Sequence, residues 1–103
     1  MLLVTTDKIT GKTFEELGIV SGSMVQSKNA FKDIGAGFKS MVGGELGSYT
    51  KMLQEARDIA TQRMVKQAEQ MGADAIVCVR FSSSAVMQGA AEILASGTAV
   101  KFA

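Results

Sequence analysis

The sequence predicts a single α+β domain with two layers, in which helices pack on a β-sheet. Three observations support this fold class. The chain has 103 residues, the length of one domain, and residues 1–103 contain no internal repeat or linker. Short β-branched segments lie toward both ends of the chain, and a long amphipathic helical pattern lies between them. The expected order, β-β-α-α-β-β, is typical of an α+β arrangement.

Two strands are expected before the first helix. Leu2–Thr6 is short, apolar and β-branched, and Thr10–Thr13 has the composition of a turn. The second strand is expected over Leu17–Ser27, where alternation places Gly18 and Gly22 on the same face as the apolar Val20 and Met24. Glycines weaken a strand unless a bulge or another backbone lies beside them. Close packing of a neighbouring element would explain both glycines.

Two helices are expected in the middle of the chain. The first covers residues 29–42 and contains Gly35 and Gly37, each of which costs up to about 1 kcal/mol relative to alanine. The second covers Tyr49–Met71, and Gly72 follows where a left-handed C-terminal cap belongs. Its apolar stripe extends over about six turns and consists of Tyr49, Leu53, Ala56, Ala60, Met64, Ala68 and Met71. The alanines predict a neighbour that packs close to the helix axis.

Two more strands are expected after this helix. Ala75–Phe81 is the first, and strict alternation directs Val77, Val79 and Phe81 to one face and Ile76, Cys78 and Arg80 to the other. Ser82–Ser84 is expected to form a turn or an irregular link. Glu92–Phe102 is the second strand, with one apolar face formed by Leu94, Val100 and Phe102.

The composition excludes several classes of function. The chain has no histidine and one cysteine, so it lacks an imidazole base, an intrachain disulfide and the usual ligands of a single-chain zinc site. The net charge of +1 predicts no binding to nucleic acid or to an anionic membrane. The first residues lack a basic, apolar leader, and no apolar run reaches the roughly 20 residues of a transmembrane helix. We therefore expect a cytoplasmic protein.

Apolar residues on both faces of the strands favour self-association. Ile76 with Cys78, and Val20 with Met24, are expected opposite the more apolar face of their strands. In a two-layer fold that second face meets water unless another subunit covers it. The sequence therefore predicts a homo-oligomer.

Several short motifs resemble one protein family over nearly the whole chain, from Leu2 to Lys101. In order they are Gly18–Gly22, Gly43–Glu45, Tyr49, Glu55–Arg57, Ala60, Gly72–Ala75 and Gly97–Val100. Together they resemble the YbjQ-like family of small uncharacterised bacterial proteins. The resemblance implies a β/α subunit of dodecin-like topology, with strands flanking two central helices, that assembles into a homopentameric ring. It also implies heavy-metal binding, the label the family carries, and it brings no catalytic residue.

Cys78 is the soft metal ligand the sequence offers besides its methionines. In a symmetric ring each subunit would contribute one Cys78 thiolate. The alternative is that Cys78 is a small buried side chain in an apolar strand, as cysteines often are. The seven methionines are scattered over several elements, which is typical of core packing.

Glu45, Tyr49 and Arg57 form the candidate binding site. Tyr49 and Arg57 share one side of the helix to within about 80°, and arginine carries a planar set of donors that suits a carboxylate. These residues could bind a small anion beside Gly43 and Gly44. The alternative is a structural ion pair of Arg57 with Glu45 or Asp58.

The leading functional prediction is a non-enzymatic, ring-forming binding or scaffold protein of the bacterial cytoplasm, with a small-molecule site between subunits and no cofactor. The alternative is a heavy-metal-binding protein of metal stress or homeostasis. An enzyme is not expected, because without histidine acid–base chemistry would fall to Glu45, Tyr49, Asp74 or a lysine, and no partnered arrangement of these is visible. Asp74 is expected to bond the backbone of the turn after the helix.

Overall fold

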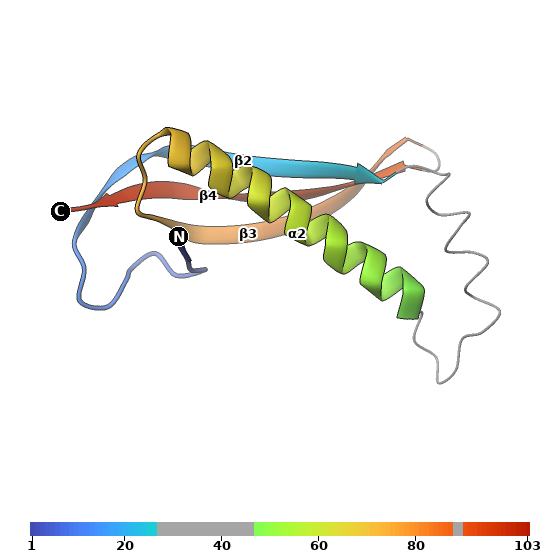
Figure 1. The fold of residues 1–103 in the computed structure, drawn as a ribbon, viewed down its shortest axis with the longest axis horizontal. Helices are drawn as coiled ribbons and strands as arrows, with labels where there is room; N and C mark the ends of the chain where they lie inside the picture. Colours follow the sequence, from blue (N-terminus) through green and yellow to red (C-terminus); the bar gives the residue numbers. More distant parts are fainter. Residues whose placement is uncertain (27–46, 88–89) are drawn as a thin grey trace.

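The computed structural model describes residues 1–26, 47–87 and 90–103, which form one helix packed on a four-stranded sheet (Figure 1). In chain order the elements are β1 (Leu2–Leu3), β2 (Phe14–Gln26), α2 (Gly47–Gln70), β3 (Ala75–Met87) and β4 (Ala90–Phe102). The strand order is β1-β3-β4-β2, with β1 parallel to β3 and the other pairs antiparallel. The two-layer α+β prediction is confirmed. The helix expected over residues 29–42 lies outside the described residues.

The long helix ends as the sequence predicts. Ala56, Ala60, Met64 and Ala68 are fully buried against the sheet. At the C-terminal end, Gly72 has a φ of 78°, a conformation that suits glycine. Its N–H donates to Glu69 O at 3.0 Å, and Ala73 N–H donates to Ala68 O at 3.1 Å. These two bonds satisfy carbonyls at the helix end and turn the chain into β3.

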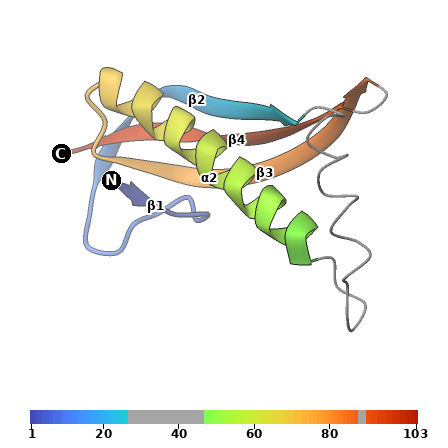
Figure 2. The same cartoon turned by 45° about the vertical axis from the view of Figure 1, so that its right-hand side comes forward.

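Gly22 explains why α2 approaches β2 so closely. The helix crosses the sheet diagonally, and its C-terminal half lies beside β2 in both views (Figures 1 and 2). A Cβ atom at Gly22 would lie closer than 3.0 Å to the backbone atoms Ala60 O and Met64 N. Gly18 has a different role, because it lies at a β-bulge with a φ of 146°. The structure therefore confirms that the two glycines accommodate a close neighbour and a bulge.

The helix covers the face of the sheet that sequence analysis expected to be open. Val20 and Ile76 are fully buried in the core under α2. On the opposite face of β2, Ile19 is 83% exposed and Val25 is 51% exposed. The expectation about which face stays open was wrong, because Gly22 lets the helix pack on the face that also carries Val20.

The β3–β4 hairpin is longer than expected. The predicted turn at Ser82–Ser84 is wrong, since these serines continue β3 and pair with Leu94, Ile93 and Glu92 of β4. Regular cross-strand pairing outweighs the weak strand preference of serine here. β1 has only two residues, but the chain after it stays beside β3, where Cys78 N–H donates to Thr6 O at 2.9 Å.

A bulge in β3 breaks the strict alternation predicted for this strand. Cys78 and Val79 lie opposite the single residue Gly97, and Cys78 has a φ of 55°. Val77 therefore packs with Ala75 and Val100 on the face away from the helix, while Val79 packs in the core under α2. The prediction that Val77, Val79 and Phe81 share one face was wrong for this reason.

A second, smaller cluster lies on the face away from the helix. Its buried members are Ala75, Val77 and Val100. Partly buried side chains from the N-terminal segment and the strand ends cover it, namely Val4, Ile9, Phe14, Cys78 and Phe102. This cluster covers only one end of that face, so Ile19 and Val25 remain exposed.

Candidate functional site

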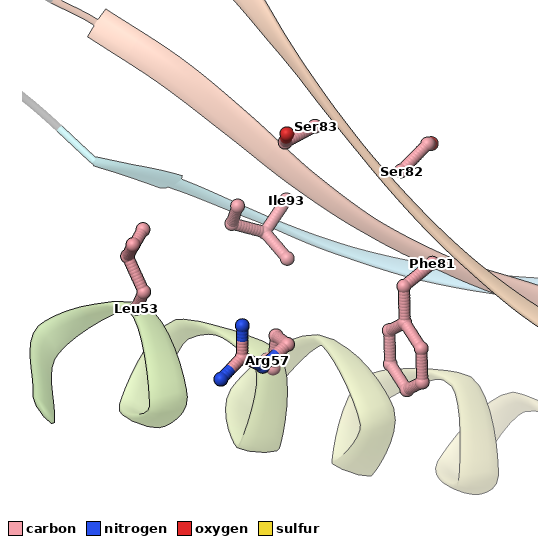
Figure 3. Close-up of a pocket in the computed structure, with 6 residues that line it drawn as sticks. All are labelled: Leu53, Arg57, Phe81, Ser82, Ser83 and Ile93. Atoms are coloured by element: carbon pink, nitrogen blue, oxygen red, sulfur yellow. The ribbon is translucent and has the colours of Figure 1, made fainter. Parts of the chain in front are cut away.

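A pocket of about 210 Å³ lies between the N-terminal half of α2 and the β3–β4 hairpin (Figure 3). Two of its lining residues come from the helix and four from the hairpin: Leu53, Arg57, Phe81, Ser82, Ser83 and Ile93. Leu53 and Arg57 are one turn apart, so they lie on the same side of α2. Phe81 and Ile93 project from the hairpin toward the helix (Figure 3), and the pocket is partly open to solvent.

Among the described residues that line the pocket, Arg57 is the charged one. Its Nη2 donates to Gln54 Oε1 at 2.9 Å, and Gln54 Nε2 donates in turn to Asp58 Oδ1 at 3.1 Å. The guanidinium thus reaches Asp58 through an amide, and Arg57 forms no ion pair within the described ranges. A guanidinium has five N–H donors, and the bond to Gln54 is the one it makes with side chains of the described residues.

The predicted site has two other members, Tyr49 and Glu45. Tyr49 lies in the first turn of α2. Eight residues separate it from Arg57, which corresponds to about 12 Å along the helix axis. Glu45, Gly43 and Gly44 lie outside the described residues. The structure therefore places Arg57 in the lining of a pocket, while the side chain of Tyr49 lies outside the described part of the chain.

Sequence reasoning missed the apolar walls of this pocket. Leu53 was assigned to the core-facing stripe, Phe81 to the same face as Val77, and Ser82 and Ser83 to a turn. The usable signal was the apolar pattern of Glu92–Phe102, which pairs with the residues after Phe81 if the two strands form a hairpin. The bulge that sets the direction of Phe81 has no comparable signature in the sequence.

Cys78 lies in the bulge of β3, partly buried beside the second apolar cluster. Across residues 1–26, 47–87 and 90–103, no three side chains of His, Cys, Asp or Glu gather in a way that could hold a metal ion. Within one chain, Cys78 therefore has no partner ligands among the described residues.

Asp74 has a structural role. Its Oδ2 accepts a hydrogen bond from Phe102 N–H at 2.8 Å and lies 3.7 Å from Lys101 Nζ. The expected bond to the turn after the helix is replaced by this bond to the end of β4. Asp74 thus fixes the loop after α2 to the sheet.

The fold and the pocket define a class of small α+β protein with an arginine-containing, partly apolar pocket between a helix and a hairpin. In the part of the chain that the structure describes, no helix has both the length and the apolarity needed to cross a membrane. The chain belongs to the YbjQ family, because the sequence model of that family matches residues 1–103. The family is described as "putative heavy-metal-binding".

Sequence relatives are found in several bacteria under the name UPF0145 protein. The chain is 60% identical to the protein from Alkaliphilus metalliredigens over 102 residues, which cover 99% of each chain. It is 54% identical to the protein from Clostridium novyi over 101 residues, which cover 98% of each chain. These matches over full length support the family assignment.

A crystal structure from Pediococcus pentosaceus has a similar fold. It is described as a protein with unknown function of the DUF74 family. The TM-score is 0.70 at 15% sequence identity, and the match covers 100% of this chain and 98% of the other. At that identity the similarity shows the fold alone.

Proposed function

We propose that this protein is a non-enzymatic binding or scaffold protein that assembles into a homo-oligomeric ring, a pentamer of dodecin-like subunits, in the bacterial cytoplasm. The observation that carries the binding role is the pocket at Arg57, which is partly open to solvent in the single chain. We infer that a second subunit closes this pocket, so that the ligand lies between subunits. We propose Glu45 and Tyr49 of the family motif as further ligand-binding residues of this site between subunits.

Exposed apolar side chains support the assembly. Ile19 and Val25 project from the open face of the sheet, and Val86 and Met87 lie exposed near the end of β3. Large apolar side chains that gather on one surface typically mark an interface. We propose that copies of the same chain cover them.

The outer edge of β2 favours contact through the face of the sheet. Ser21 N–H donates to Gln67 Oε1 at 2.7 Å, and Arg63 Nη1 donates to Ser23 O at 2.5 Å. These side chains of α2 occupy backbone groups that an added strand would need. A partner subunit therefore gains more from Ile19 and Val25 than from this edge.

Native mass spectrometry and sedimentation at micromolar concentration test the assembly. The wild-type chain is expected to form one closed oligomer. Ile19→Asp places a charge on the proposed interface, so we expect it to dissociate the ring without unfolding the subunit. Thr10→Asp adds the same charge at an exposed loop position and should leave the ring intact. A monomeric wild-type chain would contradict the proposal.

Heavy-metal binding is the second candidate, and the description of the family favours it. The described residues are compatible with metal binding at a site shared between subunits. In this site the Cys78 side chains of all subunits would meet at the symmetry axis. Elemental analysis after incubation with a soft metal tests this shared site. Cys78→Ala should abolish uptake if thiolates bind the metal, and unchanged metal content in this variant rules out the shared site.

A further inference from the structure

We propose that the pocket at Arg57 binds a small monocarboxylate that carries an aromatic or branched aliphatic group. This inference rests on the proposed binding function and names the ligand class for the same site. The geometry behind it is the placement of one guanidinium beside Leu53 of the same helix and across from two apolar side chains of the hairpin, Phe81 and Ile93 (Figure 3).

The charge of the lining selects a monoanion. The arginine side chain is a cation in proteins, and among the described residues that line the pocket none is acidic. One guanidinium balances one negative charge, so a dianion such as a phosphate monoester would keep an uncompensated charge beside apolar walls, which is costly. A carboxylate also matches the planar donor set of arginine and accepts two parallel hydrogen bonds from it.

The apolar walls select the rest of the ligand. Phe81 is 50% exposed although it faces the helix, so its ring has surface left for a ligand to cover. Leu53 and Ile93 lie on the other sides of the same space. A flat ring or a branched alkyl group would bury these three apolar surfaces, and Ser82 and Ser83 form the remaining, polar part of the lining beside Arg57.

The size of the pocket limits the ligand to a small acid. The volume of about 210 Å³ corresponds to about seven water molecules at about 30 Å³ each. Pockets for drug-sized ligands have volumes of roughly 300 to 1,000 Å³. Benzoate and 3-methylbutanoate are therefore suitable probes, and nucleotides are too large.

Ligand-detected NMR and calorimetry on the assembled protein test the proposal with charged and neutral probes of equal shape. Benzoate and 3-methylbutanoate should bind, while benzamide and 3-methylbutanamide should bind at least tenfold more weakly. Inorganic phosphate is the fifth probe, and it should bind more weakly than benzoate.

Variants separate the role of Arg57 from a general charge effect. Arg57→Gln should weaken benzoate binding on the order of tenfold to a hundredfold, as expected for the loss of charge-assisted hydrogen bonds. Lys66→Gln removes one positive charge from an exposed position of the same helix and should leave benzoate binding unchanged. Native mass spectrometry of each sample reports whether the ring persists.

The outcomes distinguish the ligand class from the proposed function. Equal binding of benzoate and benzamide, or unchanged benzoate binding in Arg57→Gln, would overturn the ligand class and leave the assembly intact. Tighter binding of phosphate than of benzoate would also overturn it, in favour of a phosphorylated ligand. No binding of any probe to an intact ring overturns the ligand class, while a monomeric wild-type chain overturns the proposed function instead.

Discussion

Replacing Gly22 by alanine should separate α2 from β2. The added Cβ would lie 2.8 Å from Arg63 Cβ and still closer to two backbone atoms of the helix, whereas ordinary contact begins at 3.4 Å. The helix backbone cannot turn aside as a flexible side chain can, so the whole element must move. That movement would also weaken the hydrogen bonds of Gln67 and Arg63 to the β2 edge. Overpacking costs about 1 to 3 kcal/mol and each weakened bond about 0.5 to 1.5 kcal/mol, so we expect a loss of about 2 to 6 kcal/mol.

Thermal unfolding followed by circular dichroism measures this loss. A decrease of about 3 kcal/mol lowers the Tm of a domain of this size by about 12 to 24 °C. All variants are compared at one protein concentration, because assembly makes the Tm concentration-dependent. Gly72→Ala is the matched control, since a Cβ there meets nothing within 4 Å and adds only the strain of a φ of 78°, about 1 to 2 kcal/mol. The packing argument is refuted if Gly22→Ala destabilises no more than this control.

Two further substitutions test the sheet. Gly97→Ala would place a Cβ 2.6 Å from Ile76 Cγ2. This overpacking should lower the free energy of unfolding, measured in urea, by about 1 to 3 kcal/mol. An unchanged free energy of unfolding would contradict the tight packing of Ile76 against Gly97. Asp74→Ala removes the acceptor of Phe102 N–H and should cost about 1 to 2 kcal/mol in the same assay. Asp7→Ala, at an exposed position, is its control, and equal losses in the two variants would contradict a structural role for Asp74.

The parts of the fold that follow a regular period could be predicted from the sequence. The central members of the stripe, Ala56, Ala60, Met64 and Ala68, keep one helical phase along α2, and all four are buried. The role of Gly22 could also be predicted, because a glycine on one face of a strand and alanines on one face of a helix both indicate that the two elements pack closely. Both predictions depend on local patterns that repeat, and repetition averages out the weak preference of any single residue.

The hairpin could not be predicted in the same way. Ser82, Ser83 and Ser84 favour turns by local chemistry, yet they remain in a strand because β4 provides partners for them. This pairing joins residues 8 to 12 positions apart, whereas the turn preference of a serine depends on its immediate neighbours. The candidate site had the same difficulty, since Arg57 could be identified from its charge but the hairpin side chains that face it could not.

The bulge at Cys78 connects this local irregularity to the candidate site. Without it, strict alternation would direct Phe81 to the same face as Val77, away from α2. With two residues opposite Gly97, the phase of the strand changes, and Phe81 pairs with Ala95 on the face toward the helix. Phe81 can then form a wall of the pocket opposite Arg57 (Figure 3). The single cysteine, first considered as a metal ligand, thus contributes to the pocket through the conformation of its backbone.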